Sequence, residues 1–255
     1  LRAAGFQVFG AGVDVAEAAA STTAEVDGLR VGFIGLTCDS THPARDAGGV
    51  VLSLQSPDVL ARVTAARKGC DLLVVSVHWG DEHVAWPSPG QVRMARQLVE
   101  AGADVVAGHH AHVLQGCERY RHGVIAYGLG GITIAGLQQR VVWQGVAQDY
   151  RFLPEPRHRR TAVMTVAVEA GRVVGASLDE VRIAADGRPA PTGRRRMMSW
   201  GRGLRLWHLP AYALFYRAVV FVQFWLLPRA RVLLSRRTLH KLRRLAGLPS
   251  ADKLG

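Results

Sequence analysis

Three short apolar runs set the predicted architecture of the N-terminal half. They are Val31–Leu36 (VGFIGL), Leu72–Val77 (LLVVSV) and Asp104–Ala107 (DVVA). Continuous apolar runs of this length, bounded by Gly and polar residues, are typical of strands that are covered on both faces. Ser-Pro pairs at 56–57 and 88–89 predict helix starts, and Gly69 and Gly102 predict the corresponding ends. The order strand, helix, strand, helix, strand predicts a largely parallel, helix-covered α/β sheet.

The second half of the chain has a different hydrophobic pattern, in which short apolar segments are separated by Gly-containing turns. We predict strands at 124–127, 132–134, 162–168 and 172–177, as an antiparallel extension or a second sheet. The stretches 154–160 (PEPRHRR) and 184–196 (AADGRPAPTGRRR) are rich in Pro and charge, which predicts loops. The predicted organisation is a domain over 1–185, a linker over 186–199 and a basic, aromatic helical tail over 200–255.

Charge is divided unevenly along the chain. The net charge is +12, but residues 1–193 hold 18 Lys and Arg against 19 Asp and Glu, whereas residues 194–255 hold 14 against one. With 49% hydrophobic and 20% charged residues, the chain has the composition of an ordered globular protein. The basic excess therefore belongs to the tail, which could meet anionic lipid, polymer or nucleic acid.

Two segments of the tail are relevant to whether the chain binds a membrane. Residues 209–227 contain one charge, Arg217, and approach the minimum length of a spanning helix, but an arginine near the centre is costly in lipid. Residues 229–248 alternate apolar and basic positions, as in a helix that lies on an anionic membrane surface or docks on a partner. An ordinary amphipathic helix packed on its own domain is the alternative. No nucleic-acid recognition module accompanies the basic residues, which disfavours nucleic acid.

The cysteines and the N-terminus say little about location. Cys38, Cys70 and Cys117 are widely separated, which argues against a disulfide framework or a thiolate zinc cluster and predicts free, mostly buried thiols. The chain starts without Met or a signal pattern, inside a helix-like LRAAGF, so we expect it to be the downstream part of something longer. We predict peripheral membrane association through the tail, with a soluble cytoplasmic protein as the alternative.

Histidines follow two neighbouring strands at the point where each is predicted to end. His78 directly follows LLVVSV, and His110 and His112 follow the next strand in the segment GHHAH. Ligands of open α/β sheets gather beyond the carboxyl ends of the strands, so these three imidazoles should meet at one edge. A lone histidine is more often structural, but a His-x-His pair beside a third His predicts a metal site. Candidate partners for the second ring nitrogens, or plain surface charges, are Asp81, Glu82 and Asp104.

The stretch 74–131 also resembles a known family. Its H-W-G, P-x-x-Q, G-A-D, H-x-H-V-x-Q and Y-x-L-G motifs are similar to those of the CapA proteins of poly-γ-glutamate capsule synthesis, a branch of the calcineurin-like metallophosphatases. The resemblance spans about residues 1–180. It implies the C-terminal part of a metallophosphatase-like α/β sandwich of mixed sheets, with two divalent metal ions (Mn, Fe or Zn) in the complete domain. His78 matches the single-histidine ligand, and His110 with His112 matches the G-H-x-H loop.

Other positions match this pattern less directly. His109 falls where such sequences vary, and Gln115 and Tyr120 match positions whose expected role is to shape the loop. The resemblance also implies an aspartate and an Asn-His pair upstream of residue 1, which would supply further ligands and the proton donor. Residues 127–132 read YGLGGI where the family usually has S-L-G-N-F, so an expected polar pair has become glycines.

Two functions from different classes follow from these patterns. One is a metal-dependent hydrolase that acts on a phosphoester or a polymer bond, for which the intact histidines argue. The other is a non-catalytic, membrane-associated assembly or anchoring protein for an anionic polymer such as poly-γ-glutamate, for which Gly128 and Gly131 argue. The catalytic and substrate-binding residues are not identified by the sequence.

Overall fold

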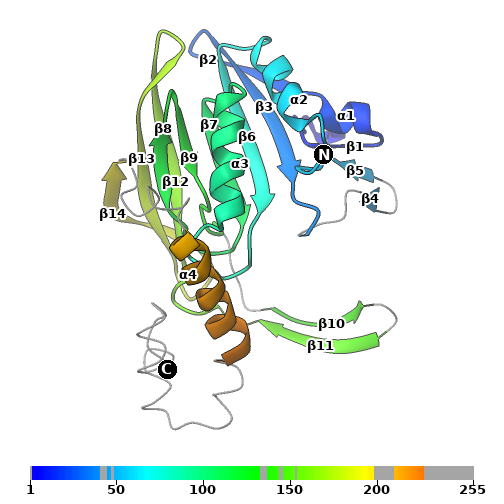
Figure 1. The fold of residues 1–255 in the computed structure, drawn as a ribbon, viewed down its shortest axis with the longest axis vertical. Helices are drawn as coiled ribbons and strands as arrows, with labels where there is room; N and C mark the ends of the chain where they lie inside the picture. Colours follow the sequence, from blue (N-terminus) through cyan, green and yellow to red (C-terminus); the bar gives the residue numbers. More distant parts are fainter. Residues whose placement is uncertain are drawn as a thin grey trace.

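A six-stranded sheet forms the centre of the molecule (Figure 1). The structure is a computed structural model that describes residues 2–40, 45–46, 49–132, 137–143, 146–152, 154–197 and 210–226. Along the sheet the order is β2 (Thr22–Val26), β3 (Leu29–Thr37), β6 (Leu72–Trp79), β7 (Val105–His110), β9 (Gly123–Ala126) and β8 (Cys117–Tyr120). The four inner strands are parallel and the two edge strands are antiparallel to their neighbours, so the predicted parallel core is confirmed.

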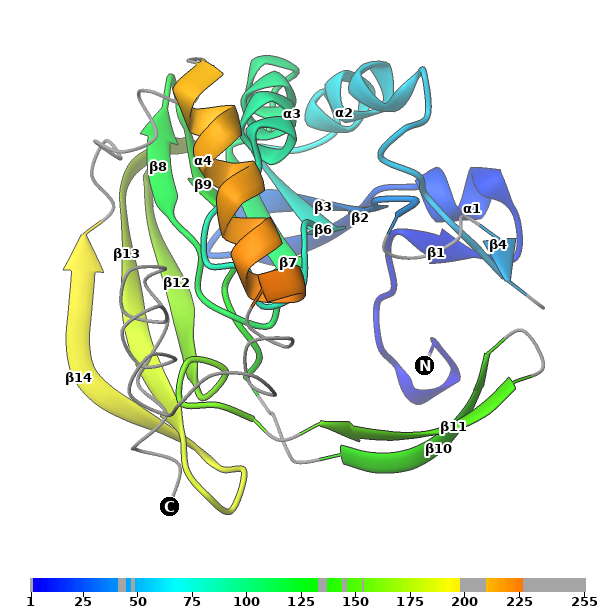
Figure 2. The ribbon, with the colours of Figure 1, turned by 60° about the horizontal axis from the view of Figure 1, so that its bottom comes forward.

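Helices cover one face of this sheet, as the two Ser-Pro signals predict. They are α2 (Val59–Arg67) and α3 (Pro89–Glu100), with the short α1 (Val15–Ala19) beyond the sheet edge (Figure 2). Ser88 caps α3: its hydroxyl accepts from the Gln91 backbone N–H while the Gln91 side chain accepts from the Ser88 N–H. The core beneath the helices is formed by alternate strand residues such as Val75, Val77 and Val106, all fully buried.

The opposite face of the sheet is covered by a second, antiparallel sheet. Its strands are β12 (Arg160–Glu169), β13 (Arg172–Ile183) and β14 (Pro189–Met197). Leu72, Val105 and Val124 of the central sheet pack in one cluster with Val173 and Leu178 of the second. The molecule therefore has three layers, helices, mixed sheet and antiparallel sheet, which confirms the predicted α/β sandwich of mixed sheets (Figure 2).

The prediction of a loop over 184–196 is wrong, because β14 occupies most of this range. Pro189 can lie in this strand because β14 is an edge strand, where a missing N–H costs no ladder hydrogen bond. Residues 156–159, directly before β12, form turns within the loop predicted over 154–160. Ile132 lies in a bend rather than a strand, and residues 133–134 lie outside the described part. The domain division near residue 185 stays a prediction.

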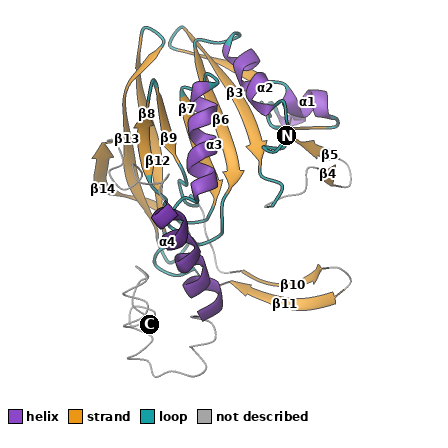
Figure 3. Cartoon of the chain, in the orientation of Figure 1, coloured by secondary structure: helices purple, strands orange, loops and turns teal. Residues whose placement is uncertain are grey.

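Smaller elements complete the described fold (Figure 3). The turn η1 (Arg2–Ala4) precedes a small sheet of β1 (Ala11–Gly12), β5 (Gly49–Val51) and β4 (Arg45–Asp46). A hairpin of β10 (Leu137–Trp143) and β11 (Val146–Phe152) projects away from both large sheets (Figures 1 and 2). The three cysteines form no disulfide, and only Cys70 is fully buried, so burial is less complete than predicted.

Candidate metal centre

The predicted histidines lie together at the carboxyl edge of the central sheet. His78 is the penultimate residue of β6, His110 is the last residue of β7, and His112 follows two residues later. The ring centroids of His78 and His110 are 4.4 Å apart, and those of His110 and His112 are 5.9 Å apart. Buried apolar residues anchor both strands, so the strand ends hold these rings in place. We call His78, Glu82, His110 and His112 the histidine rim.

The backbone at His110 explains how its ring reaches His78. In the ladder between β6 and β7, His78 pairs with His109 and Trp79 pairs with His110, so regular alternation would put the His110 ring on the Trp79 side. His110 has φ +86° and His112 has φ +55°, in the left-handed region that non-glycine residues seldom adopt. This turn of the backbone directs the His110 ring to the His78 side. Such backbone strain concentrates at functional sites.

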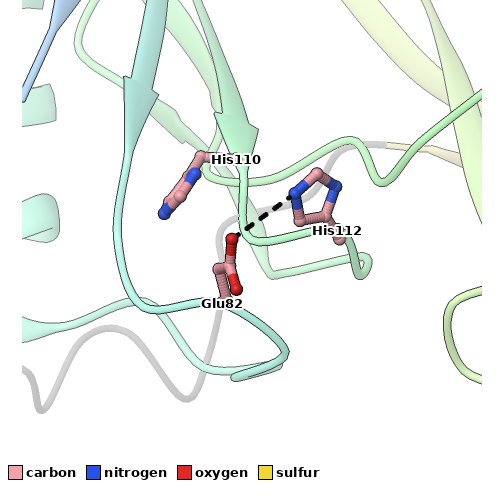
Figure 4. A group of neighbouring side chains, drawn as sticks. All are labelled: Glu82, His110 and His112. Carbon is pink, nitrogen blue, oxygen red and sulfur yellow. Dashed lines mark ion pairs between the residues drawn. The ribbon is translucent and has the colours of Figure 1, made fainter. Parts of the chain in front are cut away.

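Glu82 completes the tightest set of donors (Figure 4). One donor atom each from Glu82, His110 and His112 lies within 4.8 Å of the others, and Glu82 Oε1 is 3.8 Å from His112 Nε2. Among the described residues the donor atoms of Glu82, His110 and His112 converge, and the His78 ring packs against that of His110. The ligand set His78, His110 and His112 stays a prediction. The sequence pointed to Glu82, four residues after His78, only as a partner to a ligand or a surface charge.

These residues fit a divalent cation. Two imidazole nitrogens and a carboxylate are a donor set used for Zn²⁺, Mn²⁺ and Fe²⁺. Burial lowers the pKa of His110, which keeps the ring in the neutral form that ligates metals, although the Glu82 charge opposes the shift. Ligand atoms around one zinc ion lie about 3.4 Å apart in a tetrahedral site. The Glu82 to His112 distance of 3.8 Å therefore needs only a small side-chain rotation.

Comparison with known proteins places the chain in a family. The model of the family described as "Bacterial capsule synthesis protein PGA_cap" matches residues 1–134. The chain belongs to this family. The match contains all four residues of the histidine rim, and it ends before β10 and everything that follows.

Curated relatives agree with the family match. The capsule biosynthesis protein CapA of Bacillus anthracis is 39% identical over 119 residues, which are 42% of this chain and 28% of that protein. The PGA biosynthesis protein CapA of Bacillus subtilis is 33% identical over 129 residues, 49% of this chain and 34% of that protein. A probable polyglutamine synthesis accessory protein of Mycobacterium tuberculosis is 34% identical over 147 residues, 52% of this chain and 38% of that protein. The aligned part is thus about a third of each relative.

Within the family-matched region, glycine allows the strands beside the rim to approach closely. A Cβ atom on Gly108 would lie 1.9 Å from the carbonyl oxygen of Tyr127, and the same oxygen accepts a hydrogen bond of 2.9 Å from Trp79 Nε1. Gly108 thus brings β7, β6 and the end of β9 together directly below the histidines. The G of the G-H-H-A-H segment is required by packing.

Gln115 shapes the loop that bears Glu82, the role predicted for it. Its amide nitrogen donates to the Val84 carbonyl at 2.9 Å, and its Oε1 accepts from Gln91 Nε2 at 3.2 Å. Gly128 packs against this side chain, since a Cβ there would lie 3.1 Å from Gln115 Cγ. Tyr120, the other predicted loop residue, instead donates to Glu100 on the exposed side of α3.

The remaining candidate residues have structural partners. Asp104 is buried, accepts from the Leu73 N–H and pairs with Arg67 Nε at 3.3 Å. Asp81 accepts a hydrogen bond from Tyr216. Neither residue contacts the rim imidazoles through any described hydrogen bond. Burial lowers the pKa of His109, which lies outside the donor group.

A second histidine pair adjoins the rim from a distant part of the sequence. His158, in the turn before β12, packs edge-on against His83 with ring centroids 4.5 Å apart, and His83 lies 6.1 Å from His112. Burial, followed by the charges of its neighbours, lowers the pKa of His158 to about 3. No sequence signal linked His158 to His83, because the two are 75 positions apart and belong to different layers.

Helix α4 (Pro210–Phe221), continued by the π-helical η3 (Val222–Leu226), packs on the Glu82 loop. Tyr212 donates to the Pro87 carbonyl at 2.7 Å, Tyr216 donates to Asp81 Oδ2 at 2.5 Å, and Gln223 Nε2 lies 3.5 Å from the Glu82 carbonyl. Within the described residues no helix is both long and apolar enough to cross a membrane, α4 included. The amphipathic segment predicted over 229–248 lies outside the described residues.

Proposed function

We propose that this chain acts in bacterial capsule synthesis, on a poly-γ-glutamate-type anionic polymer, and supplies ligands to a metal-dependent hydrolase site. The capsule role is supported by the family match and by the names of the aligned relatives. The observation that supports the metal site most directly is the convergence of Glu82, His110 and His112 at the strand ends.

The chain's own residues would divide the work at this site. His110 and His112 offer neutral imidazole nitrogens, Glu82 offers a carboxylate, and the His78 ring packs against His110 and orients it. Bound divalent ions, two in the complete domain, would polarise an ester or amide-like oxygen and make water a better nucleophile near neutral pH. The substrate would be a phosphoester or a bond of the polymer itself.

A non-catalytic assembly or anchoring role is the second candidate. Gly128 and Gly131 stand where the resemblance leads us to expect polar side chains, so any polar contact that those side chains would make to a substrate is lost. Gly130 keeps the turn, with φ +77° and space for no side chain, because a Cβ would lie 2.8 Å from the Arg160 carbonyl. In this role the fold would handle the polymer without cleaving it.

Calorimetric titration of the chain with Mn²⁺ and Zn²⁺ tests the metal site. We expect weak binding that is lost in His110→Ala and His112→Ala and retained in His122→Ala, an exposed histidine in the turn between β8 and β9. Equal binding by all three variants would rule out the histidine rim as the site.

Hydrolysis of a chromogenic phosphoester separates the two candidate functions. We expect little turnover by this chain, since it offers three imidazoles and one carboxylate. A longer form that contains the aspartate and the Asn-His pair should bind two metals per chain and hydrolyse the ester. An empty site in that form would favour assembly, and robust turnover by residues 1–255 would contradict the need for further ligands.

A further inference from the structure

The carboxylate of the histidine rim lies largely at the surface. The side chain of Glu82 is 47% exposed, and that of its neighbour His112 is 46% exposed. An exposed glutamate can adopt several rotamers, so its backbone must be fixed if the carboxylate is to stay beside the imidazoles. Residues 80–88, which connect β6 to α3, therefore decide where this donor lies, and we call them the Glu82 loop.

The body of the domain anchors the middle of the Glu82 loop. Val84 is fully buried, and its carbonyl accepts from Gln115 Nε2 at 2.9 Å. The His83 N–H donates to the Ala111 carbonyl at 2.7 Å. Both anchors follow Glu82 in the sequence, so they fix the loop on the C-terminal side of that residue.

Helix α4 and the following η3 contact the N-terminal end of the loop. The Tyr216 hydroxyl donates to the carboxylate of Asp81, directly before Glu82. In η3, Gln223 Nε2 lies 3.5 Å from the Glu82 carbonyl oxygen. Burial, and then the hydrogen bond to Asp81, raise the pKa of Tyr216, so its hydroxyl stays protonated and donates. A hydrogen bond to a charged acceptor is roughly twice as strong as a neutral one, so we expect this to be the strongest contact between α4 and the loop.

The same helix contacts the C-terminal end of the loop. Tyr212, which belongs to the main core cluster, donates to the Pro87 carbonyl at 2.7 Å. The Phe215 ring packs edge-on against Trp86, with centroids 5.4 Å apart. Helix α4 thus spans the loop from residue 81 to residue 87 at the carboxyl edge of the sheet (Figure 1). It lies beyond residues 1–134, so this support comes from a part of the chain that the family model does not match.

We propose that Tyr216 is a positioning residue for the metal centre. Through Asp81, it holds the Glu82 carboxylate beside the two imidazoles of the donor group. This inference rests on the proposed function, because it concerns the ligand set of the proposed site. Loss of the Tyr216 hydroxyl should free the start of the loop, and the exposed carboxylate should then spend less time beside the imidazoles.

Hydrogen exchange of the metal-free chain tests the positioning directly. In Tyr216→Phe we expect the hydrogen-bonded amides of His83 and Val84 to exchange about tenfold faster, because the loop opens more often. Tyr120→Phe, which also deletes a hydrogen bond between a tyrosine and a carboxylate, is the matched control and should leave these amides unchanged. Faster exchange confined to α4 would overturn the proposal, since the helix would then loosen without disturbing the Glu82 loop.

Calorimetric titration with Mn²⁺ supplies a second readout. Tyr216→Phe should bind the cation about fivefold more weakly than the unmodified chain, and Tyr120→Phe should match the unmodified chain. In a Glu82→Ala background, Tyr216→Phe should cause no further loss, because the group that it positions is gone. An equal loss in both backgrounds would indicate a general structural effect. Tighter binding by Tyr216→Phe would mean that Tyr216 withholds Asp81 from the metal, and either result overturns the proposal.

The two measurements separate this inference from the proposed function. If the unmodified chain binds no Mn²⁺, the proposed metal site fails, while faster exchange at His83 and Val84 in Tyr216→Phe still supports the positioning of the loop. If the chain binds Mn²⁺ but Tyr216→Phe changes neither exchange nor affinity, the metal site stands and the positioning role is overturned.

Discussion

The histidine rim and helix α4 lie next to each other but are built on opposite principles. At the rim, fully buried apolar strands end abruptly, and the polar side chains that follow are pushed to the sheet edge. On α4, the buried side is held by phenol hydroxyls and the exposed side is apolar. Because core packing positions the histidine rim, we expect substitutions in the strands beneath it to destabilise the whole fold. Because a few hydrogen bonds hold α4, we expect the loss of one of them to weaken its attachment only in part.

Gly108→Ala, beneath the histidine rim, should have the largest effect on stability. The added Cβ would lie 1.9 Å from the Tyr127 carbonyl, so strands β7 and β9 would have to separate. We expect a loss of about 4 kcal/mol or more in the free energy of unfolding, measured by urea denaturation. Gly90→Ala in α3 is the matched control, since its Cβ has ordinary contacts and alanine should stabilise the helix by about 0.5 kcal/mol. Equal stability of the two variants would contradict core placement of the rim.

Acid should weaken the attachment of the His158 turn beside the rim. The folded-state pKa of His158 is about 3 against an ordinary 6.5, so between these values the unfolded chain binds a proton that the folded chain does not. The contribution of His158 to the free energy of unfolding is present in full above pH 6.5. It is lost as the pH falls towards 3, by up to about 1.4 kcal/mol per pH unit. Protonation would also remove the hydrogen bond that Nδ1 accepts from the Glu155 N–H.

The variant His158→Asn isolates this effect. Asparagine has no titrating proton, and its carbonyl oxygen can accept from the same N–H, so the stability difference between pH 7 and pH 4.5 should shrink by about 2 kcal/mol. Urea denaturation of both proteins at these two pH values measures it. If the two proteins lost the same stability on acidification, His158 would not be the titrating group.

Removing the Tyr216 hydroxyl tests how α4 is held. Tyr216→Phe leaves the ring in place but deletes the hydrogen bond to the Asp81 carboxylate, so we expect a loss of about 2 kcal/mol. Earlier cleavage in the C-terminal region by limited proteolysis should accompany it. Tyr120→Phe, which deletes an exposed hydrogen bond to Glu100, is the control and should cost less than about 0.5 kcal/mol. If both changes were neutral, apolar packing rather than hydrogen bonding would hold α4.

The smallest expected effect concerns the base of α3. Ser88→Ala removes one half of a capping box next to the Pro87 carbonyl that Tyr212 contacts, which should cost about 1 kcal/mol in thermal or urea unfolding. Ser88→Asp should restore most of that stability, because aspartate caps helices as well as serine. Failure of the aspartate to rescue would argue against loss of the cap as the cause.

Much of the central sheet could be predicted because its signals are local. The runs that end at His78 and His110 are largely apolar, and the Ser-Pro and Gly signals bound the helices that precede the strands. Parallel order then follows from the helical connections, and it brings the two strand ends to one edge. The same logic failed for β14, where Pro and charged residues suggested a loop, because an edge strand can accommodate both.

By itself, the sequence determined that His78, His110 and His112 would meet, because strand periodicity and parallel connection leave few other places for them. Tertiary structure alone decided that Glu82 joins His110 and His112, that His158 packs beside them and that α4 covers the Glu82 loop. These contacts join segments from different layers, and they depend on packing and on a left-handed turn at His110 that no local pattern encodes. The reversed polarity of α4 likewise became visible only once the body that it packs against was in place.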